Sequence, residues 1–303
     1  MSERYKLSPY MNRFVEQSLS FFPSSITAQG IDAERKAYDL MANKMSLPRP
    51  AEIEVCDIEI GGINVRNYLP GGRSPSGRVL FVHGGGWYLG NLDSHDSFCG
   101  HLSNDCSIAV TSVDYRLAPE FPYPAALDDV YSVYKAMLVK DRIPPLVVGD
   151  SAGGNLIAAL SFRCRRLGAP MPTAQILIYP CLAKPGSLKS HNTLSDAPLL
   201  SSDSINQCWK GYHNGQFDEL DEEMLPLLAD SFEGLPPASV FAAEYDPLVD
   251  DAKEYFKNLR QAGNPAHLCL VSGMVHGGLR AHGYAPEGDI LYNKICQEVK
   301  KRR

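Results

Sequence analysis

The stretch VVGDSAGGNL places Ser151 between small residues, where an apolar run gives way to a helical pattern. Small residues allow a tight turn, and such a turn lifts a serine hydroxyl out of a sheet and into a cavity. The free N–H groups at the start of the following helix favour a developing negative charge. We therefore predict that Ser151 is a nucleophile and that the Ala152 N–H is a donor to the oxyanion. The alternative is that Gly153 and Gly154 only permit close packing of helix on strand.

A second glycine-rich stretch, FVHGGGWYLGN, also follows an apolar run. Its backbone N–H groups are unobstructed and can donate to an oxyanion if they point at it. Gly85 and Gly86 are the leading candidates, and Gly84 belongs to the same predicted oxyanion hole. His83 precedes this loop, and we interpret it as a structural hydrogen-bonding residue that shapes the loop rather than as a base.

A serine nucleophile needs a base, and three histidines lie late enough in the chain to supply one. His276 is in a glycine-bearing loop directly after the last predicted strand, from which a side chain can reach over the sheet. We predict that His276 is the base and keep His282 as the second choice. His267 falls inside a predicted strand and is interpreted as a packed or edge residue.

The base in turn needs an orienting acid, which stands between serine and histidine in the chain order of α/β hydrolases. The stretch AEYDPLVDD offers Glu244, Asp246, Asp250 and Asp251. Asp246 lies in a loop and is followed by Pro247, which can begin a helix. We predict that Asp246 is the acid. Asp250 and Asp251 are expected in the first helical turn, where carboxylates stabilise the helix dipole without catalysing anything.

Eight short runs predict the strands that position these residues. The first two flank a Gly-Gly pair and predict a hairpin, whereas the later runs are continuously apolar, as in a parallel sheet covered on both faces. Alternation of strands with helices implies an open α/β sheet with its site at the carboxyl ends of the strands. The predicted strands are 53–60, 63–70, 78–83, 107–115, 145–150, 174–180, 238–244 and 266–271, and the helices are 94–105, 124–140, 152–167, 248–262 and 289–301.

Two regions do not fit this alternation. Residues 1–46 precede the first strand and show helical spacing of apolar residues, so we predict an N-terminal cap segment. Residues 183–233 form a long polar insertion between two strands, and insertions of this length are often lids or binding elements. The catalytic domain is predicted to span residues 47–303 with the insertion at about 183–233. The alternative is that the insertion is a solvated surface excursion.

The composition of the chain limits its partners. It has 303 residues, 29 basic and 35 acidic, and a formal net charge of −6, which argues against nucleic acid or an anionic membrane as partner. We expect no transmembrane helix and no secretory signal. Eight scattered cysteines without a CxxC pair are typical of reduced, mostly buried thiols and favour a cytoplasmic location. No metal and no cofactor are predicted.

Seven motifs occur in one order: HGGGW, DYRLAPE, FPYPAALDD, GDSAGGN, LLADSFEGLPP, AEYDPLVDD and GMVHGG. In these the chain resembles the hormone-sensitive-lipase family of carboxylesterases, and bacterial acetyl esterases within it. The resemblance implies an α/β-hydrolase fold with a mostly parallel eight-stranded sheet, helices on both faces and a helical cap. It also implies Ser151 as nucleophile, Asp246 as acid and His276 as base.

The resemblance further implies that the partner is a small ester with a short acyl chain, hydrolysed through an acyl-enzyme. A homodimer stays open. Tyr115, Arg116 and Asp128 are expected to brace loops near the site. The family has an aromatic residue shortly after the base, and its absence here predicts a wider pocket beside His276. The alternatives are a catalytically inactive ligand-binding protein, a lipase, a lactonase or a peptidase on the same fold.

Overall fold

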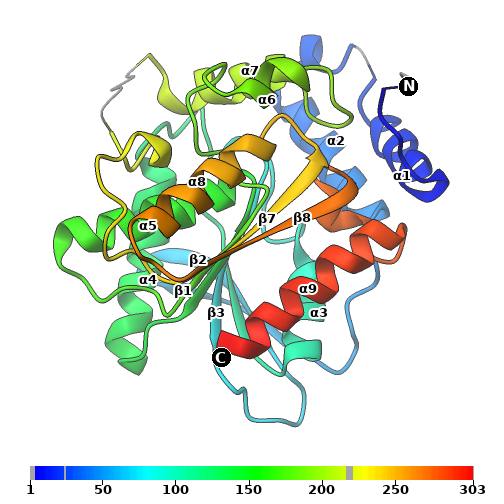
Figure 1. Ribbon diagram of the computed structural model, residues 1–303. Coiled ribbons are helices and arrows are strands. Elements are labelled where there is room, and N and C mark those ends of the chain that lie inside the picture. The colour runs from blue at the N-terminus through cyan, green and yellow to red at the C-terminus, as the bar shows by residue number, and fades with distance from the viewer. Residues whose placement is uncertain (1–3, 24, 216–220, 303) are drawn as a thin grey trace.

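A computed structural model describes residues 4–23, 25–215 and 221–302, and its strands form an eight-stranded sheet in the order β1-β2-β4-β3-β5-β6-β7-β8 (Figure 1). β1 and β2 form the predicted antiparallel hairpin, β2 pairs antiparallel with β4, and the other pairs are parallel. The mostly parallel sheet is thereby confirmed. The strands are β1 Glu54–Ile60, β2 Ile63–Leu69, β3 Arg78–Val82, β4 Ala109–Val113, β5 Leu146–Asp150, β6 Gln175–Ile178, β7 Ala238–Tyr245 and β8 Ala266–Val275.

Burial explains why the apolar runs become strands. Every residue of β4, β5 and β6 is buried, because helices cover both faces of these central strands. β8 lies at the edge and alternates between buried and exposed residues over much of its length. His267 is exposed on this strand, which agrees with its interpretation as an edge residue.

Helices cover the sheet from both sides. Figure 1 shows α3 and α9 on one face and α4, α5 and α8 on the other, and an apolar core lies between each helix layer and the sheet. Gly168 ends α5 in a left-handed conformation, which glycine adopts readily. α9 begins at Pro286, three residues earlier than predicted, because proline fits the first helical turn. These helices are α3 Asp96–Cys106, α4 Ala125–Asp141, α5 Ala152–Leu167, α8 Val249–Gln261 and α9 Pro286–Arg302.

The N-terminal segment and the insertion supply further helices near the carboxyl ends of β7 and β8 (Figure 1). Residues 216–220 of the insertion, like residues 1–3 and 24, lie outside the described part. None of the helices in the described ranges has the length and apolar character needed to cross a membrane. These elements are α1 Pro9–Leu19, η1 Thr27–Gln29, α2 Ile31–Lys44, α6 Lys189–Thr193, α7 Ser202–His213 and η2 Pro226–Leu228. A further short helix, η3 Gly278–Ala281, follows β8.

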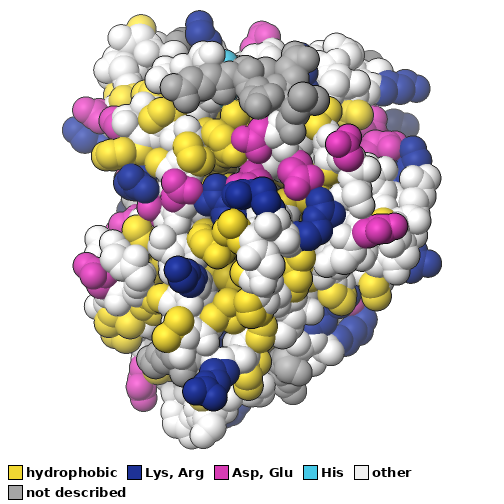
Figure 2. Space-filling view, turned by 90° about the vertical axis from the view of Figure 1, so that its left-hand side faces the viewer, with side chains coloured by type: hydrophobic (Ala, Val, Ile, Leu, Met, Phe, Trp, Pro, Cys, Tyr) yellow, Lys and Arg dark blue, Asp and Glu magenta, His cyan; other side chains and the backbone are white. Residues whose placement is uncertain are grey.

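The end of the insertion is fastened to α5 by charged side chains. Figure 2 looks at this side of the molecule and shows basic and acidic groups meeting across the middle of the surface. Arg163 is buried and contacts both Glu223 and Asp128, and Arg166 also contacts Glu223. Because Glu223 is buried as well, this cluster fixes the return of the insertion to the sheet.

Candidate active site

The backbone at Ser151 makes the sharp turn that the sequence predicted. Ser151 lies between β5 and α5 with φ 55° and ψ −118°, a conformation that an L-residue rarely adopts. The turn brings α5 against the sheet so closely that a Cβ atom at Gly153 would lie 2.0 Å from the Val82 carbonyl oxygen. Glycine is therefore required at position 153, and the serine hydroxyl projects from the carboxyl end of β5.

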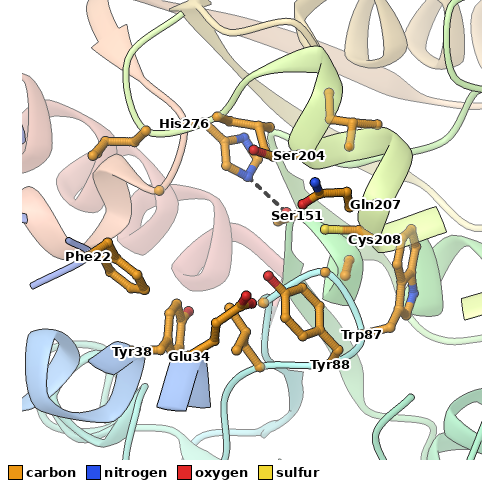
Figure 3. A pocket seen from close by; sticks show the side chains of 18 of the residues that line it. Phe22, Glu34, Tyr38, Trp87, Tyr88, Ser151, Ser204, Gln207, Cys208 and His276 are labelled. Atoms are coloured by element: carbon orange, nitrogen blue, oxygen red, sulfur yellow. Dashed lines mark hydrogen bonds between the residues drawn. The ribbon is translucent and has the colours of Figure 1, made fainter. Parts of the chain in front are cut away.

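Ser151, His276 and Asp246 form one chain of hydrogen bonds. His276 Nε2 lies 2.9 Å from Ser151 Oγ (Figure 3), and His276 Nδ1 lies 2.7 Å from Asp246 Oδ2. The other carboxylate oxygen of Asp246 accepts from the Leu248 N–H at 2.8 Å. Since an ionised carboxylate only accepts, Nδ1 carries the imidazole proton and Nε2 is left to accept the serine proton.

Each of these side chains comes from the carboxyl end of a different strand. Asp246 directly follows β7 and is fully buried, and His276 directly follows β8 and is largely buried. Glu244, the nearest alternative acid, instead accepts from the Gly273 N–H at 2.7 Å. The parallel order of β5, β6, β7 and β8 thus brings together residues separated by 125 positions in the chain.

The glycine loop after β3 lies beside the serine, but its three glycines are not equivalent. The N–H of Gly84 donates to Asp150 Oδ1 at 2.8 Å, so it is not free to meet an oxyanion. Within the described residues, the N–H groups of Gly85, Gly86 and Ala152 donate to no protein acceptor. Gly85 must be glycine, because its φ is 123° and a Cβ atom would lie 2.2 Å from the Leu89 carbonyl oxygen. Gly84 therefore leaves the predicted donor set, and the other three remain in it.

Asp150 was not singled out by the sequence, although it precedes the serine. Its carboxylate is buried, holds the Gly84 N–H and lies 3.3 Å from His95 Nε2. Burial opposes its ionisation, but His95, Arg280 and the Gly84 N–H outweigh this and hold the pKa of Asp150 below its ordinary value. Asp150 therefore anchors the glycine loop as a buried anion.

His83 is placed as a structural residue, as the sequence predicted. Its Nδ1 lies 2.8 Å from the Gly84 carbonyl oxygen, and its ring stacks on Tyr115 with centroids 4.3 Å apart. The Tyr115 hydroxyl donates to the His83 carbonyl oxygen at 2.8 Å. Burial lowers the pKa of His83 to about 4, so the ring is neutral at pH 7. Tyr115 thus braces the glycine loop.

Arg116 and Asp128, which were also expected to brace loops, pair with different partners. Arg116 forms a two-pronged ion pair with Asp129, the neighbour of the residue the sequence indicated. Asp128 pairs with Arg163 on α5 instead.

His282, the second choice for the base, lies apart from Ser151. Its Nδ1 lies 2.8 Å from Asp289 Oδ1, and it takes no part in the hydrogen bonds between Asp246, His276 and Ser151.

A cavity of about 420 Å³ opens in front of Ser151. Its walls come from α2, the glycine loop, α7 and the loop after β8, as Figure 3 shows for Glu34, Tyr88 and Cys208. Trp87 fixes α7 over the glycine loop, because it stacks on Tyr212 with ring centroids 4.3 Å apart. The cavity is thus closed by both segments that fall outside the strand–helix alternation.

An aromatic ring contacts His276, although the residues directly after it, Gly277, Gly278 and Leu279, are not aromatic. The ring of Tyr179, directly after β6, lies 4.7 Å from the imidazole of His276. The Tyr179 hydroxyl accepts from the Leu279 N–H at 3.2 Å, which ties the loop after the base to the sheet. No local pattern in the sequence indicates this contact, because residues 179 and 276 follow two different strands.

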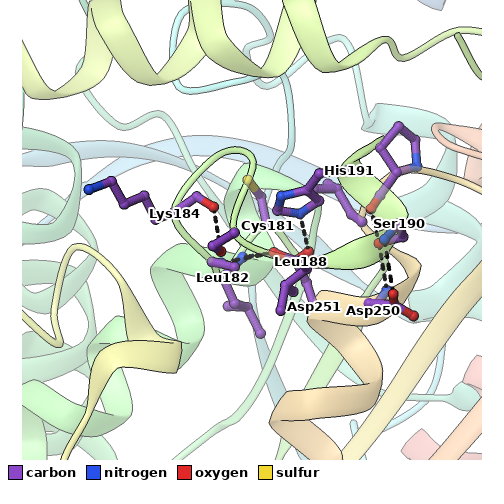
Figure 4. Close-up of polar contacts among 12 residues, drawn as sticks. Cys181, Leu182, Lys184, Leu188, Ser190, His191, Asp250 and Asp251 are labelled. Atoms are coloured by element: carbon purple, nitrogen blue, oxygen red, sulfur yellow. Dashed lines mark hydrogen bonds and ion pairs between the residues drawn. The ribbon is translucent and has the colours of Figure 1, made fainter. Parts of the chain in front are cut away.

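The first half of the insertion is held by two aspartates of α8 (Figure 4). Asp251 is fully buried and accepts from the N–H groups of Leu182 and Ala183 and from His191 Nε2, each at 2.8 Å. Asp250 accepts from the Ser190 N–H at 3.0 Å. Both lie in the first turn of α8, as predicted, and from there they also bind the insertion.

Comparison with known proteins places this site in a family. A family model described as the alpha/beta hydrolase fold matches residues 79–280. Carboxylesterase NlhH of Mycobacterium tuberculosis is 36% identical over 293 residues, covering 91% of this chain and 91% of the relative. Ethyl acetate hydrolase of Pseudomonas putida is 32% identical over 237 residues, covering 74% of each protein.

Similar solved structures indicate the same family as the relatives found by sequence. The crystal structure of an esterase from the bacterial hormone-sensitive lipase family aligns over 100% of this chain and 99% of that chain, with a TM-score of 0.90 and 26% identity. The chain therefore belongs to the α/β hydrolases and, within that fold, to the hormone-sensitive-lipase family of carboxylesterases.

Proposed function

We propose that the protein is a serine carboxylesterase that hydrolyses short-chain acyl esters through Ser151, His276 and Asp246. The observation that carries the proposal is the pair of hydrogen bonds that runs from Asp246 through His276 to the Ser151 hydroxyl. The printed names of two relatives, a carboxylesterase and an ethyl acetate hydrolase, support ester hydrolysis and a small substrate.

The reaction proceeds by two acyl transfers. His276 Nε2 takes the proton of Ser151 as Oγ attacks the ester carbonyl, and then gives it to the leaving alcohol. Asp246 keeps the imidazole in the required tautomer and stabilises its cation. A water molecule, activated by His276, then attacks the acyl-enzyme and releases the acid.

Three backbone N–H groups stabilise the negative charge of the tetrahedral intermediates in this proposal. The donors are the N–H groups of Gly85, Gly86 and Ala152, which line the same cavity as Ser151 and have no protein acceptor among the described residues. The loss of one such donor costs about 3 kcal/mol of transition-state stabilisation in other enzymes. The Gly84 N–H contributes indirectly, because its bond to Asp150 holds the loop in place.

We further propose that residues 1–46 and 183–233 act as the cap of the catalytic domain. Tyr38 on α2 and Cys208 on α7 line the same cavity as Ser151, which supports this division of the chain. The limited volume of about 420 Å³ supports a small ester as the partner.

Turnover of p-nitrophenyl acetate tests the proposed function. The wild-type protein should hydrolyse the ester, and Ser151→Ala and His276→Ala should each lose about 10⁴-fold or more in kcat. Circular dichroism should show that both variants keep the fold. Wild-type activity in the His276 variant would overturn the triad, and an inactive wild-type protein would favour the ligand-binding alternative.

A further inference from the structure

A guanidinium group reaches the cavity on the side of the base. Arg280 lies on η3, four residues after His276, and lines the same cavity as Ser151. Its Nη2 atom adjoins Gly277, since a Cβ atom at that glycine would lie 2.9 Å from it. This places a positive charge next to the loop that carries the base.

The guanidinium has hydrogen-bonding capacity that the protein does not use. Arg280 Nη1 donates to the hydroxyl oxygen of Tyr38 at 3.1 Å, and the guanidinium carbon lies 5.3 Å from the centre of the Tyr38 ring. Arg280 Nε is buried without a partner. No carboxylate of residues 4–23, 25–215 or 221–302 forms an ion pair with Arg280. A largely buried cation without a contacting anion is unusual.

Tyr38 adds a second unused donor at the same place. Figure 3 shows its side chain entering the cavity from α2. In the described structure its hydroxyl accepts from Arg280 but donates to no acceptor. An anion that contacts both groups would satisfy the Tyr38 O–H and the free N–H groups of Arg280 together, and a carboxylate has the two oxygen atoms needed.

The two carboxylates that line the cavity, Glu34 and Asp150, form no ion pair with Arg280. Asp150 accepts from the Gly84 N–H and faces His95, so it attracts Arg280 only through space. Glu34 faces the Tyr88 side chain across the cavity wall and helps to raise the pKa of that hydroxyl. The competing explanation for Arg280 is therefore that it balances the buried charge of Asp150, and the experiment must separate the two roles.

We propose that Arg280 and Tyr38 bind a carboxylate on the alcohol part of the substrate, so that acidic esters are preferred over neutral ones. The proposal rests on the esterase function proposed above. The alcohol part is indicated because the base protonates the leaving alcohol, so this part lies on the His276 side of the cavity. Arg280 adjoins Gly277 on that side.

The experiment compares 4-acetoxybenzoate with its neutral methyl ester, methyl 4-acetoxybenzoate. The ratio of their kcat/KM values is measured in the wild-type protein, Arg280→Gln and Tyr38→Phe. We expect the acid-to-neutral ratio to fall by about tenfold or more in Arg280→Gln, chiefly through KM, and by less in Tyr38→Phe. Arg260→Gln is the matched control, because Arg260 is exposed on α8 and should leave the ratio unchanged.

Two different failures are distinguishable. If Arg280→Gln lowers kcat/KM for both esters by the same factor, Arg280 only balances Asp150 and the proposal is overturned while the esterase function stands. If the wild-type protein hydrolyses neither ester, the esterase function fails and the proposal fails with it. Tyr38→Phe keeps the ring beneath the guanidinium, so an unchanged ratio in a folded Tyr38→Phe variant removes Tyr38 from the proposed site.

Discussion

His276 can serve as a base only if its two nitrogens are held in different protonation states. Asp246 fixes Nδ1 as the donor at 2.7 Å, and this leaves Nε2 to accept from Ser151 at 2.9 Å. Asp246 itself is held by the Leu248 N–H at the start of α8. The orientation of the proposed base is therefore set by the loop between β7 and α8.

Replacement of the acid is the sharpest test at the level of single residues. Asp246→Asn keeps the shape of the side chain but favours the wrong imidazole tautomer, and we expect kcat to fall by about 10³- to 10⁴-fold. Asp250→Asn is the matched control, because that carboxylate contacts Ser190 and Lys253 rather than His276. A larger loss of kcat in the Asp250 variant would contradict the assignment.

The buried ring of His83 predicts a loss of stability in acid. Burial lowers the pKa of His83 from 6.5 to about 4 in the folded protein. Below about pH 6.5 the His83 ring binds a proton in the unfolded chain, whereas in the folded chain it stays neutral until the pH approaches 4. The free energy of unfolding therefore keeps its full value above about pH 6.5 and falls as the pH drops toward 4. Between pH 7 and pH 5 the loss is about 2 kcal/mol of unfolding free energy.

Urea unfolding at several pH values measures this effect. His83→Asn lacks a titratable ring, so its unfolding free energy should fall less than that of the wild-type protein between pH 7 and pH 5. Equal slopes in the two proteins would show that the ring is protonated in the folded state as readily as in the unfolded chain.

Among the structural elements, α8 joins the proposed triad to the insertion. Its first turn begins just after Asp246 and carries Asp251, which holds Leu182, Ala183 and His191. His191 is a neutral donor to Asp251, because its Nδ1 accepts from the Gly186 N–H at 3.0 Å. One helix terminus therefore positions both the acid and the proposed cap.

Two adjacent aspartates on α8 should differ strongly in their effect on stability. Asp251→Ala leaves two backbone N–H groups and the His191 ring without their acceptor in a buried place, and we expect a loss of about 3 kcal/mol or more. Asp250→Ala removes a partly exposed carboxylate and should cost about 1 kcal/mol. Chemical denaturation compares the two, and equal losses would contradict the proposed anchoring role of Asp251.

The helices and strands could be predicted from the sequence better than the contacts between them. The central strands could be predicted because β4, β5 and β6 are buried on both faces and so are continuously apolar. The contact between Ser151 and His276 could be predicted from motif and chain order. The bond between His191 and Asp251 could not, because it joins segments 60 residues apart whose pairing depends on how the insertion folds back. The hydrogen bond from the Gly84 N–H to Asp150 could not be predicted either, because it joins the ends of two different strands, 66 positions apart in the chain.

On the scale of the whole molecule, the cavity is enclosed by segments from both ends of the chain. Tyr38 and Arg280 meet across 242 positions, and α7 closes the cavity from the insertion. No local pattern encodes such a meeting, which is why the sequence predicted a cap but not the residues that line it. The size and charge of this cavity determine which esters fit.

The cavity volume predicts a preference for short acyl chains. A space of about 420 Å³ that is shared by the acyl and alcohol parts leaves little room for a long chain. In a series of p-nitrophenyl esters from acetate to palmitate, we expect the highest kcat/KM at about two to six carbons, the range that the family resemblance also implies. An optimum at long chains would indicate a lipase and a cap that opens.

The central claim is that Ser151, activated by His276, is the nucleophile, and covalent labelling tests it most directly. The protein is treated with diethyl p-nitrophenyl phosphate, and the modified peptide is identified by mass spectrometry. We predict one diethylphosphoryl group per chain, on Ser151, with loss of esterase activity in proportion to labelling and much slower labelling of His276→Ala. Complete inactivation with the label on another residue, or full esterase activity after Ser151 is labelled, would contradict the account.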